Sequence, residues 1–548
     1  MSSATRLRLR LPLAGTLRLG RPSDIWFKPA LSSVAAVAPP NLTLLALGRL
    51  DLAMYTMAGS LCALYGHSRP YAARARALAG VVLGMVGGLA AALVAAALTT
   101  DPVVLVTIGA LMAAVQKTVC DATHIGPPGN VVLTFISSAS LFAPQSLGQV
   151  PGHLGLALAA GAWAWLVGMA PGLLRPHGPE RRATAHALNA AAAYAATRGT
   201  AEGHTKARAT CAAAVHAARQ SLPAAGARTD RTRRALERLL VRAEVALAAP
   251  ADTDPARLRA WAGDLRGTGR IPRAGIPREP AAELLGVEPG PALSRSPLRH
   301  RLAPLAPLAA RTAIGCALAG YASLALGVGR PYWALVTAAS LYQANVTLTW
   351  SRGIQRVVGN LVGVLVFAVV TPLAHLHPAA LVLCCLALTF GAEALMGRNY
   401  WLGSVCVTPM ALLITEFART QDPGRLITER VADTLVGALV GFVAAVAVTN
   451  RRAGERIEHA LTVAERAREH AARLLAEPHP EPRALEAARR TLAASLVDVR
   501  ATADAASGEW WQRALPEERV VLAEQSGHRT LAATVRRQGL APLEQDTG

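Results

Sequence analysis

Long uninterrupted runs of apolar residues recur along the chain and constrain its fold more than any other feature. A run of about 18 or more apolar residues is long enough to cross the hydrocarbon core of a bilayer as a helix. The sequence predicts twelve such helices, of which the second and fifth are short: 28–47, 52–66, 78–98, 102–118, 130–145, 153–174, 303–327, 331–346, 357–374, 378–396, 400–416 and 431–449. We therefore expect an all-α, polytopic membrane protein.

Composition supports this expectation. The chain has 548 residues, 52% of them hydrophobic, with a mean hydropathy of +0.31. The formal net charge of +21 does not indicate nucleic-acid binding, because a soluble nucleic-acid-binding protein has no use for apolar runs of this length. Basic loops and tails on one side of a membrane explain the charge better. The expected environment is a lipid bilayer, without a nucleic-acid partner.

Motifs for cofactor, metal and hydrolase chemistry are missing from the sequence. Only three lysines occur (Lys28, Lys117 and Lys206), and none follows a glycine, so the chain lacks the phosphate-binding loop of ATPases. The seven cysteines form no C-x-x-C pair, and neither H-E-x-x-H nor G-x-S-x-G occurs. We expect no enzyme activity, no catalytic residue, no cofactor and no metal site.

The apolar runs fall into two groups of six, with polar segments between and after them. Residues 175–302 hold 22 Lys and Arg against 11 Asp and Glu, and their stretch "RTRRALERLLVRAEVALAA" places apolar residues at helical spacing. The stretch "RIPRAGIPREP" at 270–280 predicts a linker. The predicted regions are a basic cytoplasmic tail at 1–27, a six-helix half at 28–174, a cytoplasmic helical domain at 175–302, a second six-helix half at 303–450 and a cytoplasmic helical tail at 451–548. The soluble helices are either scaffolding and dimer contacts, which leaves a homo-oligomer open, or regulatory domains.

Basic residues predict the orientation in the membrane. The N-terminal tail, residues 175–302 and the tail from Arg451 fall on one side of the twelve predicted spans. Lys and Arg concentrate on the cytoplasmic side of membrane proteins. Both termini are therefore predicted to be cytoplasmic, in a multi-pass protein of the plasma (inner) membrane.

A short internal similarity predicts that the two halves are repeats. "GRLDLAMYTMAG" at 48–59 and "GRPYWALVTAAS" at 329–340 share five of twelve residues when they are offset by 281 positions. An even number of spans before the middle domain gives both halves the same orientation, as in parallel transporter repeats. We expect the Gly48-Arg49 pair to superpose on Gly329-Arg330, at helix turns on the outer face.

The second half carries residues that resemble a known family. The stretches "RPYWALVTAASLYQANVTLTWSRGIQRVVGNLVGVL", "RNYWLGSVCVTPMALL" and "ERVADTLVGALVG" are similar to the fusaric-acid-resistance (FUSC) family of inner-membrane proteins, which is related to aromatic-acid exporters. The resemblance covers about 303–450 and is weaker over 28–175. It implies an efflux carrier for aromatic or phenolic carboxylic acids. The positions that carry it are Arg330-Pro331-Tyr332-Trp333-Ala334, Thr337, Arg352-Gly353, Arg356, Gly359, Gly363, Asn399-Tyr400, Thr408-Pro409, Arg430, Asp433 and Gly437.

Two pairs of arginines are candidates for an anion pathway, because the planar guanidinium donates two hydrogen bonds to a carboxylate and stays charged. Arg352 and Arg356 are four residues apart, so they share a helix face at the cytoplasmic mouth of the ninth span. They either attract an anion there or are ordinary positive-inside charges. Arg49 and Arg330 are predicted to face each other across the repeat axis at the outer exit, unless Arg330 only reaches toward the headgroups.

Aromatic and ionisable side chains complete the candidate set. Tyr332 and Trp333 either stack on an aromatic substrate or anchor the helix at the membrane interface. Ionisable residues inside spans are costly and by default mark a pathway. Arg430 and Asp433 are three apart on one helix and are expected to form an ion pair; otherwise Asp433 or Glu393 carries a coupling proton.

These observations predict a secondary transporter that exports aromatic or other organic anions. An organic-anion channel built from the same helices is one alternative. A non-transporting membrane scaffold whose helical tail recruits a partner is another. The substrate, the coupling ion and the oligomeric state are not encoded in any motif of the chain.

Overall fold

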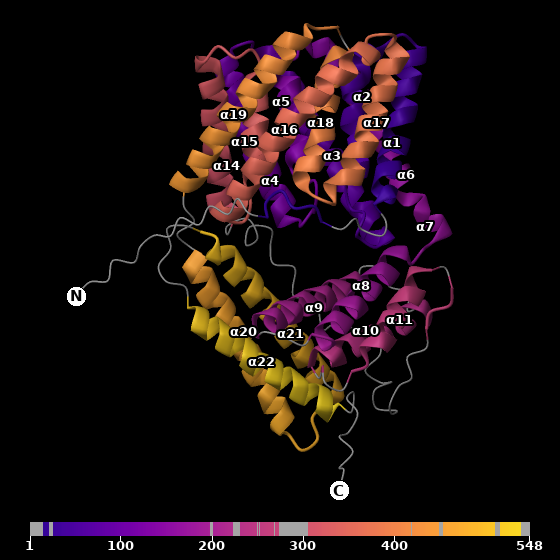
Figure 1. Ribbon diagram of the computed structural model, residues 1–548, viewed down its shortest axis with the longest axis vertical. Helices are drawn as coiled ribbons and strands as arrows, with labels where there is room; N and C mark the ends of the chain where they lie inside the picture. Colours follow the sequence, from indigo (N-terminus) through magenta and orange to yellow (C-terminus); the bar gives the residue numbers. More distant parts are fainter. Residues whose placement is uncertain are drawn as a thin grey trace, which may run out of the picture.

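A computed structural model describes residues 15–20, 26–197, 201–222, 231–248, 250, 253–267, 269–272, 305–417, 419–448, 453–509 and 516–538. All regular structure in these ranges is helical, and it forms an apolar bundle with a second group of helices at one end (Figure 1). Most of the basic tail predicted at 1–27 and of the linker predicted at 270–280 lies outside the described residues.

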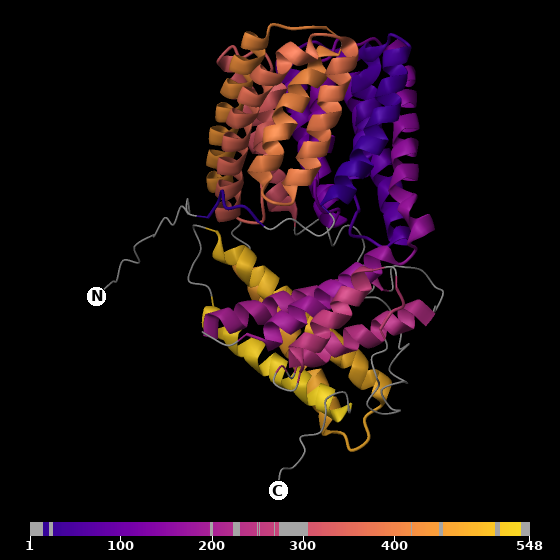
Figure 2. The same cartoon turned by 45° about the vertical axis from the view of Figure 1, so that its right-hand side comes forward.

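The bundle contains two sets of six helical segments in chain order. The first set comprises α1 (Phe27–Ala46), α2 (Ala53–Ser60) with short 3-10 turns at Leu50–Leu52 and Leu61–Leu64, α3 (Tyr71–Leu98), α4 (Pro102–Ala122), α5 (Val131–Leu141) and α6 (Val150–Met169). The second set comprises α14 (Ala306–Ala325), α15 (Pro331–Leu341), α16 (Val346–Ala374), α17 (Pro378–Met396), α18 (Tyr400–Glu416) and α19 (Pro423–Ala447). Figure 2 shows the second set, in orange, standing beside the first, in indigo and purple.

Proline and polar caps fix where several of these helices begin. α4, α17 and α19 each start with proline, whose missing N–H costs nothing in the first turn. The preceding side chains accept hydrogen bonds from the exposed amides: Asp101 from Val103 at 2.8 Å and Asp422 from Arg425 at 2.8 Å. Apolar runs that begin on such signals therefore start at defined residues.

Helix length divides the twelve segments in the same way in both sets. Among the described helices, eight are long and apolar enough to cross a membrane, and they are the first, third, fourth and sixth of each set. The expectation of twelve full spans needs correction, because the second and fifth segments are shorter. The 11 residues of α5 or α15 extend only about 16 Å, roughly half the hydrocarbon thickness. Burial against other helices shelters their ends, which lipid could not do.

Surface side chains support a lipid environment for this bundle. Leu365 and Val369 of α16 and Leu439 of α19 are 67%, 78% and 67% exposed. Contact of these apolar side chains with water would be unfavourable. Contiguous exposed apolar surface of this kind marks contact with a membrane or another protein. The chain is a polytopic, all-α membrane protein, as the sequence predicts.

Neighbour relations repeat as well. In each set the second helix packs on the first and sixth, and the third packs on the fifth and sixth. Across the sets, α1 packs on α17 and α14 packs on α4, which is the same pairing of a first helix with a fourth helix in both directions. The two six-helix sets thus share one pattern of helix contacts, which is the pattern expected of repeats related by a pseudo-twofold axis.

The proposed superposition of the Gly-Arg pairs is only half correct. Gly48 and Gly327 adopt left-handed backbone conformations, with φ +66° and +68°, and close the ends of α1 and α14. Gly48 therefore matches Gly327, because only glycine adopts that conformation without strain. Arg49 and Arg330 do match, since each is the residue that precedes the next helical turn. The second-half connection is thus two residues longer.

Among the described residues, seven further helices form the extramembrane group, in two subsets with separate apolar cores. The first subset is α8 (Gly178–Ala195), α9 (Ala201–Ser221), α10 (Arg231–Ala248) and α11 (Pro255–Arg266). The second is α20 (Ala453–Ala476), α21 (Pro482–Ser507) and α22 (Glu517–Arg537). Both lie at the same end of the bundle (Figure 1), with the short α7 (Pro171–Leu174) between α6 and α8.

The end of α21 contacts the bundle directly. The Gly508 carbonyl accepts hydrogen bonds from the amide and hydroxyl of Thr347, at 3.1 and 3.0 Å. Arg311, which is 3% exposed, lies 3.5 Å from the carboxylate of Glu509. These contacts show that α16 begins at the bundle end facing the extramembrane helices.

Candidate functional site

Two arginines one turn apart on α16 contact the same tyrosine. The guanidinium carbon of Arg352 lies 3.9 Å from the centre of the Tyr400 ring, and Nη1 of Arg356 donates to the Tyr400 hydroxyl at 3.0 Å. Arg356 is 4% exposed, and its Nε has no hydrogen-bond partner among the described residues. The predicted shared face of Arg352 and Arg356 is therefore present, and it points into the protein.

Polar side chains continue from Arg356 through the middle of the second half. Asn360, one turn further along α16, donates to Thr434 of α19 at 3.0 Å and accepts from Thr408 of α18. All three are fully buried. They carry hydrogen-bonding groups across a region that is otherwise apolar.

Close helix approach brings these groups together. A Cβ on Gly359 would lie 2.5 Å from Cβ of Ser404, and one on Gly363 would lie 2.7 Å from Cβ of Thr408. A Cβ on Gly437 would lie 2.5 Å from the Ala334 carbonyl oxygen. Only glycine permits this spacing between α16, α18, α19 and α15, so the glycines position the polar groups.

A second buried arginine occupies the other end of this path. Arg430 of α19 is 2% exposed, and its guanidinium carbon lies 5.1 Å from the Trp333 ring centre. Its Nε and Nη1 have no hydrogen-bond partner among the described residues. The set from Arg352 to Arg430 is called the polar column below: Ser323, Trp333, Arg352, Arg356, Asn360, Tyr400, Thr408, Arg430, Asp433 and Thr434.

Arg330 closes the column at the end away from the extramembrane helices. Its Nε donates to Glu429 at 3.1 Å. Its guanidinium carbon lies 4.9 Å from the centre of the Trp333 ring. It also donates to Gln421. Trp333, fully buried, is thus flanked by two guanidinium groups, so the structure does not place it as an interfacial anchor.

Comparison with known proteins identifies this half of the chain. Residues 316–444 match the family described as fusaric acid resistance protein-like. The second half carries a fusaric acid resistance-like segment. The expected resemblance over about 303–450 is thereby confirmed for most of its length.

One curated relative matches over a limited stretch. It is the "Uncharacterized membrane protein YvaC" of Bacillus subtilis (strain 168), 30% identical over 139 residues, which are 25% of this chain and 22% of that protein. The match thus spans less than a quarter of the relative's length. No solved structure matches the chain.

The fusaric acid resistance-like segment contains the whole polar column, from Ser323 to Thr434. The structure also corrects where its arginines lie. The ninth span was predicted to begin at 357, but α16 begins at Val346, so Arg356 is its eleventh residue and not a charge outside the span. Hydropathy did not place "VTLTWSRGIQR" in the span because the stretch is polar, but its Thr349 and Arg356 side chains are buried by the protein.

Two predicted relations between charged residues are not formed. Asp433 accepts a hydrogen bond from Ser323 at 2.6 Å, and no ion pair joins it to Arg430 among the described residues. Arg430 packs on Trp333 instead. Arg49 does not engage Arg330: it binds Asp51 through two hydrogen bonds of 3.1 and 3.0 Å, and both side chains are about half exposed.

The remaining candidates occupy separate places. Tyr332 stacks on Phe142 of the first half, with ring centres 5.8 Å apart, so it contributes to the contact between the halves. Glu393 is partly buried on α17 and forms no hydrogen bond or ion pair with any described residue. The described residues also contain no cluster of three or more His, Cys, Asp or Glu suited to a metal ion.

The first half contains a separate, neutral set of polar contacts between α4 and α5. Gln116 of α4 donates to Ser137 at 2.7 Å and accepts from Thr134 at 2.9 Å, both on α5. Asn130 adds a bond to Thr134 at 3.2 Å. The two sets therefore differ in charge: among their described residues, the first set buries Arg74 near the start of α3, and the second set buries Arg311, Arg356 and Arg430.

A short segment covers the column at the end facing the extramembrane helices. We call residues 15–20 the N-terminal strap. The Thr16 carbonyl accepts from Gln355 at 2.9 Å and from Asn399 at 3.1 Å, and the Leu17 carbonyl accepts from Trp401 at 3.2 Å. Gln355 and Trp401 directly adjoin Arg356 and Tyr400 in sequence, so the strap lies beside the arginine end of the column.

Sequence reasoning did not single out Glu429 or Asn360. Glu429 bridges Arg330 and Arg425, the latter at 2.7 Å. The four-residue spacing from Arg425 to Glu429 could have predicted the ion pair between these two residues, but not the contact of Glu429 with Arg330. Nothing in the spacing of Asn360 marks its bonds to two other helices, because those depend on how the helices pack.

Proposed function

We propose that the chain is a secondary transporter that moves organic anions, with an aromatic or similar carboxylate passing along the polar column. The observation that carries this proposal is the pair of buried arginines, Arg356 and Arg430, with guanidinium N–H groups that no described residue accepts. Both lie in helices long and apolar enough to span a membrane.

Energetics favour an anion as the partner of these groups. A buried charged donor left without an acceptor costs more than the roughly 1–3 kcal/mol of a neutral one. Ionisable side chains persist inside membrane spans where they serve a pathway. A carboxylate accepts two parallel hydrogen bonds from a guanidinium, and Trp333 and Tyr400 offer aromatic faces beside the two arginines.

The direction of transport follows from the same proposal. The extramembrane helices and the basic loops are assigned to the cytoplasm by the positive-inside rule, in a plasma-membrane protein with both termini inside. Arg352 and Arg356 then form the cytoplasmic end of the column, and Arg430 forms the outer end, with Arg330 beyond it. Export along this path agrees with the family resemblance of the second half.

The decisive test removes the charge of Arg356. In liposomes with purified protein, we expect Arg356→Gln to raise the apparent KM for radiolabelled benzoate about 10- to 150-fold, since losing a charged hydrogen-bond partner costs about 1.5–3 kcal/mol. Arg356→Lys keeps the charge but not the planar fork, so it should retain part of the transport.

A matched control is Arg74→Gln, which removes a buried arginine near the start of the third helix of the other repeat. It should leave the benzoate KM unchanged at equal protein abundance. Wild-type transport by Arg356→Gln would show that the column is not the pathway. Ohmic benzoate currents across a planar bilayer would assign the same column to a channel instead of a carrier.

A further inference from the structure

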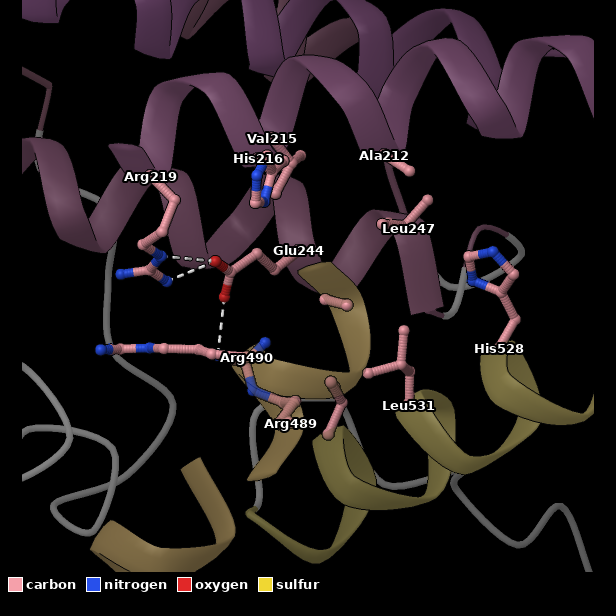
Figure 3. Close-up of a pocket in the computed structure, with 12 residues that line it drawn as sticks. Ala212, Val215, His216, Arg219, Glu244, Leu247, Arg489, Arg490, His528 and Leu531 are labelled. Carbon is pink, nitrogen blue, oxygen red and sulfur yellow. Dashed lines mark hydrogen bonds and ion pairs between the residues drawn. The ribbon is translucent and has the colours of Figure 1, made fainter. Parts of the chain in front are cut away.

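A pocket lies where the two extramembrane subsets meet, with α9 and α10 on one side and α21 and α22 on the other (Figure 3). Its cavity volume is about 60 Å³. One part of the lining is apolar and includes Val215, Leu247 and Leu531. The other part carries three arginines, Arg219, Arg489 and Arg490, with one carboxylate, Glu244.

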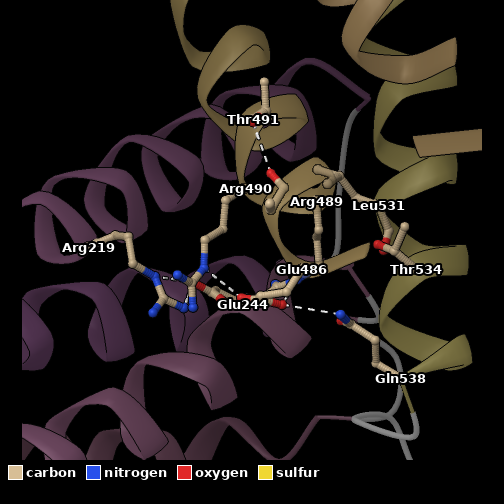
Figure 4. A network of polar contacts seen from close by, with 10 residues as sticks. Arg219, Glu244, Glu486, Arg489, Arg490, Thr491, Leu531, Thr534 and Gln538 are labelled. Atoms are coloured by element: carbon tan, nitrogen blue, oxygen red, sulfur yellow. Dashed lines mark hydrogen bonds and ion pairs between the residues drawn. The ribbon is translucent and has the colours of Figure 1, made fainter. Parts of the chain in front are cut away.

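The arginines belong to a buried charge network that joins the subsets (Figure 4). Arg219 binds Glu244, with its Nε at 2.9 Å, and Arg489 reaches the same carboxylate at 2.7 Å. Arg489 and Arg490 also bind Glu486, at 2.8 and 2.6 Å. Three guanidinium groups thus face two carboxylates, which leaves the network with one net positive charge at the pocket wall.

His528 adds an unpartnered polar atom to the same lining. Its Nδ1 is buried and has no hydrogen-bond partner among the described residues. Burial, reinforced by Arg208, lowers the pKa of His528 to about 4, so the ring is neutral at physiological pH. Figure 3 shows His528 across the pocket from the arginines, where a neutral imidazole can hydrogen-bond a ligand without adding a further charge.

We propose that this pocket binds a small organic anion with an apolar body, such as a carboxylate on a single ring. The excess positive charge of Arg219, Arg489 and Arg490 attracts the carboxylate, and Val215, Leu247 and Leu531 contact the ring. Pockets with apolar walls and a few convergent polar groups are the usual sites for such ligands. The pocket shares a ligand class with the polar column but none of its residues.

The position of α21 gives this site a consequence for the membrane half. Arg489 and Arg490 lie near the start of α21, and its other end is hydrogen-bonded through Gly508 to Thr347 on α16. The two contacts are 18 residues apart along one helix, or about 27 Å. Occupancy of the pocket therefore acts on the helix that touches the base of α16, which carries Arg352 and Arg356.

The test uses the full chain in nanodiscs at pH 7.5, with 4-fluorobenzoate as the probe and its fluorine NMR signal as the readout. Arg356→Gln is present throughout, so that binding to the column is weakened. We expect saturable binding in this background, at least about tenfold weakened by Leu531→Trp, which fills the pocket. Leu522→Trp is the matched control, because Leu522 is 60% exposed on the same helix.

A ligand control keeps the proposal testable if Leu531→Trp disturbs folding. 4-Fluorobenzyl alcohol has the same ring without the charge, so it should bind at least about tenfold more weakly than 4-fluorobenzoate, as expected for the loss of a charged hydrogen bond. Equal binding of acid and alcohol overturns the proposal, as does absence of binding in Arg356→Gln or unchanged affinity in Leu531→Trp. These outcomes do not depend on whether Arg356→Gln affects transport.

Discussion

Buried arginines occur in this chain in two kinds of surroundings. Arg489 lies between Glu244 and Glu486, and these carboxylates raise its pKa further despite the burial that opposes its charge. Arg356 and Arg430 have no such carboxylate partner among the described residues. Arg489 joins two helix subsets and contributes positive charge to the pocket between them, whereas Arg356 and Arg430 keep N–H groups that no described residue accepts.

The same network predicts acid sensitivity. Burial opposes ionisation of Glu244, but Arg219, Arg489 and Arg490 outweigh it and lower the pKa to about 2. A carboxyl group of depressed pKa stabilises the folded state fully above its unfolded pKa of about 4.3, and that contribution is lost as pH falls toward 2. The contact between the two extramembrane subsets should therefore persist at pH 5 and weaken only in stronger acid.

His528 should make α22 sensitive to milder acid. Its pKa of about 4 lies below the unfolded value of about 6.5, so opening the structure takes up a proton between these pH values and stability falls as pH drops. We expect hydrogen-exchange protection of α22, corrected for intrinsic rates, to fall from pH 7 to pH 5. His528→Gln should reduce that fall, and His470→Gln, at an exposed histidine of α20, should not. An unchanged pH slope in His528→Gln would contradict the assignment.

At the scale of helices, the sequence predicts which segments are apolar helices but not where all of them begin. The sequence predicts all twelve apolar segments, and both bounds of α17 and of α18 coincide with the predicted residues. The starts of α3, α16 and α19 lie 7, 11 and 8 residues earlier than predicted. Their first turns are polar, and hydropathy cannot register that neighbouring helices or water satisfy those turns. Arg356 and Arg430 lie in these unpredicted turns, so each is further inside its helix than the sequence indicated.

Contacts within the site were out of reach for a different reason. The bonds of Asn360 to Thr408 and Thr434, and the packing of Arg430 on Trp333, join four helices that are distant in sequence. Spacing along one helix predicts neighbours at three and four residues only. It correctly placed Arg352 and Arg356 on one face and wrongly paired Arg430 with Asp433, because Trp333 and Ser323 compete for those two side chains.

The N-terminal strap depends on one glycine. The Gly20 amide donates to the Arg398 carbonyl at 2.8 Å, and a Cβ on Gly20 would lie 2.9 Å from that oxygen. We expect Gly20→Val to displace the strap and to raise hydrogen exchange at residues 15–20. Gly397→Val is the control, since a Cβ there would meet nothing within 4 Å. Equal protection in both variants would show that the strap does not rely on this contact.

In the whole molecule, the C-terminal end of α21 connects the extramembrane helices to the base of α16. Its Arg489 belongs to the network with α10, while Gly508 and Glu509 beyond its end contact Thr347 and Arg311 in the membrane half. A helix of 26 residues is rigid enough to carry a displacement from one contact to the other. The arrangement allows the extramembrane subsets to act on α16 without touching the polar column.

Gly508→Val tests this connection. A Cβ on Gly508 would overlap the side chain of Asn345, so the substitution should separate α21 from α16. The Thr347 amide then loses its bond to the Gly508 carbonyl, worth about 1 kcal/mol, and its exchange should accelerate roughly fivefold. Gly454→Val is the control, because Gly454 lies at the start of α20 and a Cβ there would meet nothing within 4 Å. Protein abundance should not change in either variant, since the substitutions lie outside the spans. Unaltered Thr347 exchange in Gly508→Val would mean that α21 does not hold the base of α16.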